Sequence, residues 1–269
     1  MKGKIGIYSW FGAELHMSER LRLIKEAGFD TTMLWWGDEV AFWDFNKGEL
    51  INEVYHAGLE VENIHLPYYD IHHIWEHSIR SDDVIKSIQV GIEDCSIFGI
   101  EGVVIHVEND MMINYNQNTG LDNLKRLVWE AEKKDIIIAV ENTKNNQIVE
   151  RVFHEIKSSH LKFCYDSSHD WLLNGSKGDW ILKYANRLHY LHLSDNDFVA
   201  DRHWIPGEGL IQWEKVVKNL QEVKYSGTVS FEVCPFDYTV NSEELLKKVF
   251  EFGRSIKSQL DEKGVAYDN

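Results

Sequence analysis

The chain has 269 residues, with 44 acidic and 28 basic side chains and a formal net charge of −16. A surface this acidic repels phosphate backbones, which argues against general binding to nucleic acid or to anionic membranes. Three cysteines without a Cys-x-x-Cys spacing build neither a disulfide framework nor a thiolate zinc site, which indicates a reducing compartment. Because no apolar run is long enough for a signal sequence or a membrane span, we expect a cytoplasmic protein.

Short apolar runs rich in β-branched and aromatic residues alternate with longer helical patterns. Several runs are nearly continuous in apolar residues, as strands buried on both faces should be. The expected strands are Lys4–Tyr8, Thr31–Trp35, Val61–His65, Gly102–His106, Ile136–Glu141, Leu161–Tyr165, Leu188–Leu193 and Thr228–Val233. The expected helices are Ser18–Ala27, Glu49–Ala57, Asp82–Phe98, Leu121–Lys133, Asn146–Lys157, Gly178–Ala185, Ile211–Leu220 and Glu243–Lys257.

Capping residues predict where some of these helices begin and end. Ser18 and Ser242 precede apolar runs and suit N-cap positions. Gly28 and Gly99 directly follow two of the expected helices and suit C-cap positions.

Eight strands alternating with eight helices predict an α/β fold, a (β/α)₈ TIM barrel that occupies residues 1–269 as a single domain. The alternative is an open doubly wound sheet, which usually carries a Gly-x-Gly-x-x-Gly loop after its first strand. Here the first strand is followed by Ser-Trp-Phe-Gly-Ala, so the barrel is favoured.

Six successive expected strands, the third to the eighth, carry a histidine or a carboxylate at or beside their carboxyl ends. In a (β/α)₈ barrel those ends meet at one mouth, where the chemistry of the fold takes place. With one residue of slack in each boundary, chance would give this pattern in roughly one per cent of sequences. The six residues are His65, His106, Glu141, Asp166, His192 and Glu232.

The loops after the sixth and seventh strands add three more metal-binding residue types, His169, Asp201 and His203. A lone histidine at a strand end is more often structural, but several carboxylates in one low-dielectric mouth repel one another and need a cation. Few basic residues are available there. Imidazole with carboxylate oxygen suits Zn²⁺ or Mn²⁺ best, with Co²⁺, Fe²⁺ or Mg²⁺ as alternatives. We therefore expect one to three divalent ions.

Aromatic residues follow the first strands. Trp10 and Trp35 lie at the ends of the first two strands, and Tyr68 follows the third. These rings could wall a pocket and stack on a sugar face, or they could only cap the barrel. We name them as candidate substrate contacts.

Short motifs surround the strand-end residues from the third strand onwards. They are VVIHVE around His106, AVEN around Glu141, YDSSH from Tyr165, LHLSDND around His192, DRHWIPGEGLIQW from Asp201 and SFEV around Glu232. With these motifs the sequence resembles the xylose isomerase-like TIM barrel superfamily over about two thirds of its length. This superfamily contains sugar isomerases and epimerases, and also apurinic-site nucleases of the endonuclease IV type.

The isomerase and epimerase branch implies one central metal ion. The implied ligands are Glu141, Asp166, His192 and Glu232. His169 and Arg202 would face the substrate, which would be a sugar, a sugar phosphate or a related polyol. Glu141 and Glu232 would be catalytic, one removing the proton next to the substrate carbonyl and the other returning it through an enediolate.

The nuclease branch implies a three-zinc cluster with five further ligands, and all five positions match. They are His65, His106, His169, Asp201 and His203. Charge favours the sugar enzyme, because gripping a DNA backbone needs Lys and Arg. The segment 37–44 has three acids and no base, and Glu108, Asp110, Asp195 and Asp197 follow later strands.

A third hypothesis is a carbohydrate-binding barrel without catalysis. No expected ligand is missing, so nothing in the sequence favours it. The oligomeric state stays open.

Overall fold

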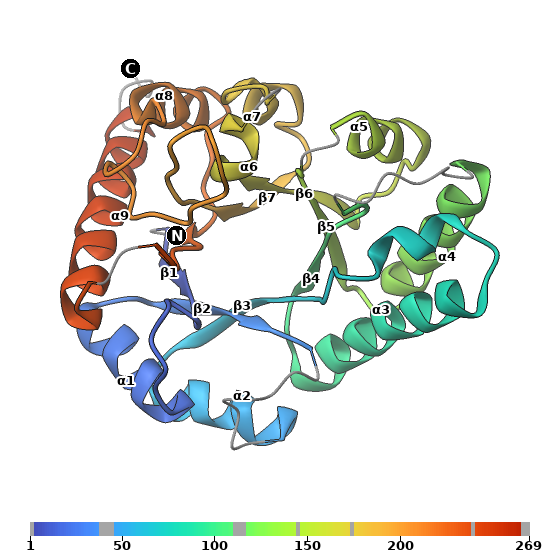
Figure 1. The fold of residues 1–269 in the computed structure, drawn as a ribbon, viewed down its shortest axis with the longest axis horizontal. Helices are drawn as coiled ribbons and strands as arrows, with labels where there is room; N and C mark the ends of the chain where they lie inside the picture. Colours follow the sequence, from blue (N-terminus) through green and yellow to red (C-terminus); the bar gives the residue numbers. More distant parts are fainter. Residues whose placement is uncertain are drawn as a thin grey trace.

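The computed structural model describes residues 3–37, 46–109, 117–143, 146–172, 175–237 and 240–264. Eight parallel strands form a ring with helices around its outside (Figure 1). The strand order is β7-β6-β5-β4-β3-β2-β1-β8, and a parallel bridge between Leu193 and Phe231 joins the two edges. The predicted (β/α)₈ barrel is therefore confirmed.

The elements follow one another in the predicted order, and strand bounds differ from the predicted ones by two residues at most. The strands are β1 (Ile5–Tyr8), β2 (Thr31–Trp35), β3 (Glu60–His65), β4 (Gly102–Ile105), β5 (Ile137–Glu141), β6 (Leu161–Asp166), β7 (Leu188–His192) and β8 (Val229–Phe231). The helices are α1 (Met17–Ala27), α2 (Lys47–His56), η1 (Ile71–Trp75), α3 (Ile79–Phe98), α4 (Gln117–Lys133), α5 (Asn146–Glu155), α6 (Ser167–Trp171), α7 (Asp179–Lys183), α8 (Trp213–Glu222) and α9 (Ser242–Gly264). Among the described residues, no helix has the length and apolar character needed to cross a bilayer.

Both predicted N-caps are wrong by one or two positions. The side chain of His16 accepts a hydrogen bond from the backbone N–H of Ser18, so Ser18 lies inside the first turn of α1. The Oδ1 atom of Asn241 accepts two backbone N–H groups at the start of α9, which makes Asn241 rather than Ser242 the capping residue. Both neighbours offer a polar side chain, and sequence position alone does not decide which one turns back onto the helix.

The predicted C-caps are confirmed. Gly28 and Gly99 end α1 and α3 in the left-handed conformation, with φ of 110° and 71°. A β-carbon makes this conformation costly, so glycine ends both helices at defined points.

A buried carboxyl lies inside the barrel at the amino ends of the strands. Glu62 of β3 accepts hydrogen bonds through Oε2 from the hydroxyls of Thr31 (3.3 Å) and Ser230, while its Oε1 atom makes none. Gly6 of β1 leaves room for this group, since a β-carbon there would lie 2.7 Å from Oε2 of Glu62. Burial raises the pKa of Glu62 from 4.5 to about 7.

We expect Glu62→Gln to stabilise the fold at pH 8 and to change little at pH 4.5. Raising a carboxyl pKa from 4.5 to about 7 on folding removes about 3 kcal/mol of stability as pH rises through that interval. Glutamine has no proton to lose and keeps an oxygen for Thr31 and Ser230. Urea unfolding at both pH values measures the effect, with Glu60→Gln on the exposed start of β3 as control. An equal effect of Glu62→Gln at both pH values would refute the argument.

Candidate metal centre

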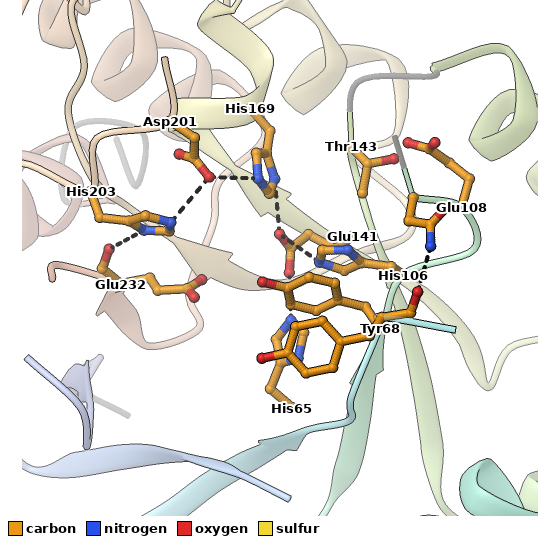
Figure 2. Close-up of a pocket in the computed structure, with 12 residues that line it drawn as sticks. His65, Tyr68, His106, Glu108, Glu141, Thr143, His169, Asp201, His203 and Glu232 are labelled. Carbon is orange, nitrogen blue, oxygen red and sulfur yellow. Dashed lines mark hydrogen bonds and ion pairs between the residues drawn. The ribbon is translucent and has the colours of Figure 1, made fainter. Parts of the chain in front are cut away.

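A cavity of about 370 Å³ opens at the carboxyl ends of the strands (Figure 2). Seven of the nine predicted ligands line it. They are His65, His106, Glu141, His169, Asp201, His203 and Glu232. The other two, Asp166 and His192, end β6 and β7 and are buried, with 0% and 1% exposure. The strand ends therefore bring the predicted ligands together.

Glu141, the last residue of β5, lies among four imidazoles. Its Oε2 atom is 3.2 Å from Nε2 of His65 and 2.9 Å from Nδ1 of His192. Its Oε1 atom is 3.0 Å from Nδ1 of His169 and 3.4 Å from Nε2 of His106. Burial alone would raise the pKa of Glu141, but the charges and hydrogen bonds of these imidazoles hold that pKa well below its ordinary value.

Four residues place one donor atom each within 4.8 Å of one another. They are Glu141, Asp166, His192 and Glu232. Nδ1 of His192 lies 2.9 Å from Oε2 of Glu232 and 2.9 Å from Oε2 of Glu141, while Nε2 of His192 and Oδ2 of Asp166 make no hydrogen bond. Buried polar atoms without partners are costly. A divalent cation between the four donors would satisfy these atoms, so the residues fit the predicted central metal.

His65 is oriented like a metal ligand. Its Nδ1 atom lies 2.9 Å from the carbonyl oxygen of Leu66, so Nδ1–H donates and Nε2 is left facing Glu141. A hydrogen bond of this kind fixes the tautomer of metal-bound histidines. His65, Glu141 and His192 also place their donor atoms within 4.8 Å of one another.

A third group of donors is linked through Asp201. Oδ2 of Asp201 lies 3.1 Å from Nε2 of His169 and 3.1 Å from Nε2 of His203. Nδ1–H of His203 donates to the backbone oxygen of Glu232 at 3.0 Å, which turns Nε2 towards Asp201. Burial lowers the pKa of His203, but the Asp201 carboxylate outweighs it and raises that pKa to about 10. Among the described residues, these three donors are not one of the groups whose ligand atoms all lie within 4.8 Å of one another, so a further ion here stays a prediction.

The backbone helps to aim two of these side chains. Oδ1 of Asp166 accepts the backbone N–H of His169 at 2.6 Å and so caps α6, which fixes the spacing of the pair. His203 has a φ of 49°, a left-handed conformation that β-carbons disfavour. The chain therefore bends sharply where His203 turns into the cavity.

Two of the four predicted substrate contacts outside the ligand set lie against the metal centre. The ring of Tyr68 stacks on His106 with centroids 4.4 Å apart, and it lines the cavity. Trp35 stacks on His65 at 5.6 Å and contacts Tyr68 edge-on. Tyr68 is part of the cavity wall, whereas Trp35 contacts His65 and Tyr68 but is not among the described residues that line the cavity. Contact of either ring with substrate stays a prediction.

The other two predicted contacts are not among the described residues that line the cavity. The guanidinium of Arg202 is held by Asp197 at 3.0 Å and by Asp237 at 3.3 Å. Trp10 lies under the guanidinium of Arg20, 5.1 Å from its ring centroid. The structure therefore does not bring Arg202 or Trp10 to the cavity, and their roles stay predictions.

Sequence reasoning gave no substrate role to Glu108, Thr143, Tyr69 and Asn109, all of which line the cavity. Glu108 follows His106 by two residues, and Thr143 follows Glu141 by two residues. Because side chains two residues apart in an extended chain point to the same side, this spacing could have predicted that both line the cavity.

The acidic residues that follow the strand ends have different surroundings. Asp195 is buried and accepts hydrogen bonds from Gly207 and Trp213, both at 2.8 Å, so it holds its own loop together. The acids of segment 37–44 and Asp110 lie outside the described residues.

Residues 21–256 match the family described as the xylose isomerase-like TIM barrel. The chain belongs to this family. The uncharacterised protein y4fM of Sinorhizobium fredii is 25% identical over 278 residues, which cover 89% of each chain. A D-psicose 3-epimerase of Enterocloster bolteae is 28% identical over 118 residues, 41% of this chain and 38% of that protein.

Solved structures have the same fold. An L-ribulose 3-epimerase is 16% identical with a TM-score of 0.80 and covers 99% of both chains. A D-tagatose 3-epimerase-like protein is 21% identical with a TM-score of 0.80 and covers 97% of this chain and 100% of that one. At this sequence identity the likeness shows the fold alone.

Proposed function

We propose that the protein is a divalent-metal-dependent sugar isomerase or epimerase that moves a proton next to the carbonyl of a sugar or polyol. The observation that carries the proposal is the arrangement of Glu141 and Glu232. Each places a carboxylate oxygen 2.9 Å from Nδ1 of His192, and both line the same cavity. Epimerase names among the relatives support the same reaction class.

Glu232 is ionised at neutral pH, which is the state that can accept a proton. Burial would raise its pKa, but the imidazoles of His192 and His203 bring that pKa down to about 2, so the group is a carboxylate at neutral pH. Its side chain is 19% exposed while that of Glu141 is 1% exposed, so Glu232 is the more accessible of the two carboxylates. A bound divalent ion would supply Lewis-acid polarisation of the carbonyl.

The return of the proton would use the second carboxyl. Glu141 also lies 2.9 Å from Nδ1 of His192, and after taking up a proton from His169 it would deliver that proton to the opposite face of the same carbon, which inverts it. His169 bridges Glu141 and Asp201 through its two nitrogens, at 3.0 and 3.1 Å. It would hold Glu141 in place and supply it with the proton that is returned to the substrate.

Solvent exchange tests the proposal. The protein loaded with Mn²⁺ is incubated in D₂O with a panel of ketopentoses and ketohexoses, followed by mass spectrometry and proton NMR. We expect one deuterium per turnover at the carbon next to the carbonyl, together with an epimer or an aldose. If the metal content is verified and no sugar of the panel takes up deuterium, the proposal is contradicted.

A second candidate function is metal-dependent cleavage of phosphodiesters at abasic sites. It is favoured by one observation, the placement of Asp201 between His169 and His203 beside the cluster around Glu141. Zinc-loaded protein and a duplex with one abasic site test it. We expect no incision at an equimolar ratio, because none of the described residues that line the cavity is Lys or Arg.

A further inference from the structure

Asn142, the residue directly after Glu141, is buried between the ends of β5 and β6, with 1% exposure. The backbone ladder between these neighbouring strands ends with Glu141 opposite Cys164, and the N–H of Asn142 donates to the oxygen of Cys164 at 3.4 Å. Beyond that point the side-chain amide takes over. Its Nδ2–H donates to the backbone oxygen of Asp166 at 2.8 Å, and its Oδ1 accepts the backbone N–H of Asp166 at 2.8 Å.

The amide of Asn142 acts here as a peptide group would. It offers one donor and one acceptor side by side, so it continues the ladder between β5 and β6 past the last backbone pair. Its orientation is fixed, because the N–H of Asp166 only donates and the carbonyl oxygen only accepts. Asp166 has 0% exposure, so loss of the amide would remove two hydrogen bonds in a buried place.

These two hydrogen bonds bear on the carboxylate of Asp166. Its Oδ1 atom is held separately, because it accepts the backbone N–H of His169 at 2.6 Å at the start of α6. Its Oδ2 atom makes no hydrogen bond, and Asp166 is one of the four residues whose donor atoms lie within 4.8 Å of one another. With the main chain and Oδ1 both held, Oδ2 is the atom left for an ion.

The backbone of Asn142 also contacts His169. Its carbonyl oxygen lies 3.0 Å from Nδ1 of His169, and since a carbonyl only accepts, Nδ1 carries the proton. The same Nδ1 lies 3.0 Å from Oε1 of Glu141, and Nε2 faces Asp201 at 3.1 Å. One residue therefore restrains both Asp166 and His169, which stand on the other side of the β5–β6 junction.

We propose that Asn142 is a positioning residue of the metal centre, which places Asp166 and His169 without touching the ion or the substrate. It is not among the described residues that line the cavity. The inference rests on the metal centre of the proposed function and adds a residue on which the placement of its donors depends. Residues that orient metal ligands in this way typically change metal affinity or activity by about 10- to 100-fold when they are replaced.

Asn142→Ala and Asn142→Leu test the assignment in the full chain. Alanine leaves space in which water can bond to the backbone of Asp166, whereas leucine fills that space with an apolar side chain of similar size. Electron paramagnetic resonance of free Mn²⁺ measures the Kd, and the signal of bound Mn²⁺ reports the symmetry of the site. We expect both variants to raise the Kd about tenfold or more, to alter the bound signal, and to lower kcat at saturating Mn²⁺.

Asn219→Ala is the matched control. Asn219 of α8 is also a buried asparagine, 4% exposed, and its Nδ2–H donates to the backbone oxygen of Gly178 at 2.9 Å, away from the cavity. We expect this variant to lower the thermal midpoint of the metal-free protein, as Asn142→Ala does, and to keep the wild-type Kd for Mn²⁺. An unchanged Kd in Asn142→Ala, or an equal rise in Asn219→Ala, would overturn the assignment.

A structure of the Mn²⁺-loaded wild type decides the matter if neither Asn142 variant folds. We expect Oδ2 of Asp166 on the ion and both hydrogen bonds of the Asn142 amide in place, and an amide turned away from Asp166 would refute the positioning role. Failure of the proposed function is a separate result. A wild type that binds Mn²⁺ with a Kd dependent on Asn142, but exchanges no proton of any sugar, would support the role of Asn142 and refute epimerisation or isomerisation.

Discussion

Glu141→Gln should lower kcat by about a thousandfold or more while the barrel stays folded. The carboxylate is both a predicted proton carrier and a donor of the central metal set, and an amide can neither accept the proton nor balance the charge of a dication. Glutamine has the same shape, so the packing around β5 is preserved. The neighbouring imidazoles at 2.9 to 3.4 Å lose their shared carboxylate, which should weaken metal binding as well.

Incorporation of deuterium from D₂O into the substrate measures the rate of proton transfer separately from the net conversion of substrate to product. Glu62→Gln is the matched control, because it also replaces a buried carboxyl inside the barrel. Glu62 lies near the amino end of β3, whereas Glu141 lies at the carboxyl end of β5. We expect the control to keep the wild-type rate. Proton exchange at the wild-type rate in Glu141→Gln would exclude the proposed chemistry.

Removing metal should abolish turnover and lower the thermal midpoint of unfolding. Without a cation, the carboxylates of Glu141, Asp166 and Glu232 repel one another in a buried mouth, and Oδ2 of Asp166 and Nε2 of His192 stay without a hydrogen bond. A ligand at a thousand times its Kd adds about 4 kcal/mol to stability. Re-addition of Mn²⁺ or Zn²⁺ after chelation should restore both properties.

Asp166→Asn separates a specific site from general ionic effects. Asparagine keeps the oxygen that accepts the backbone N–H of His169 at 2.6 Å, so the cap of α6 survives. We expect the metal-induced rise in the midpoint to shrink strongly in this variant. The metal centre would be contradicted if metal raised the midpoint of Asp166→Asn as much as that of the wild type, or if chelation left the midpoint of the wild type unchanged.

The barrel was predictable because its strands are buried on both faces and read as apolar runs. The convergence of the candidate ligands on one mouth was predictable for a related reason, since His65, His106 and Glu141 stand at or next to the last residues of such runs. The short helices η1 and α6 were not predicted, whereas α7, which also has five residues, was predicted as the longer helix Gly178–Ala185.

The directions of the side chains in the loops could not be predicted from the sequence. Arg202 follows a ligand in the sequence, but the structure turns it towards Asp197 and Asp237, and only the fold brings those three together. The contact of Asp201 with both His169 and His203 likewise depends on how the loop after β7 returns to the mouth.

Anomalous scattering from crystals of the purified protein grown with Mn²⁺ or Zn²⁺ tests the central claim most directly. We predict a strong peak held jointly by one donor each from Glu141, Asp166, His192 and Glu232. No peak at this position in metal-replete crystals, or ions bound only elsewhere on the protein, would contradict the account.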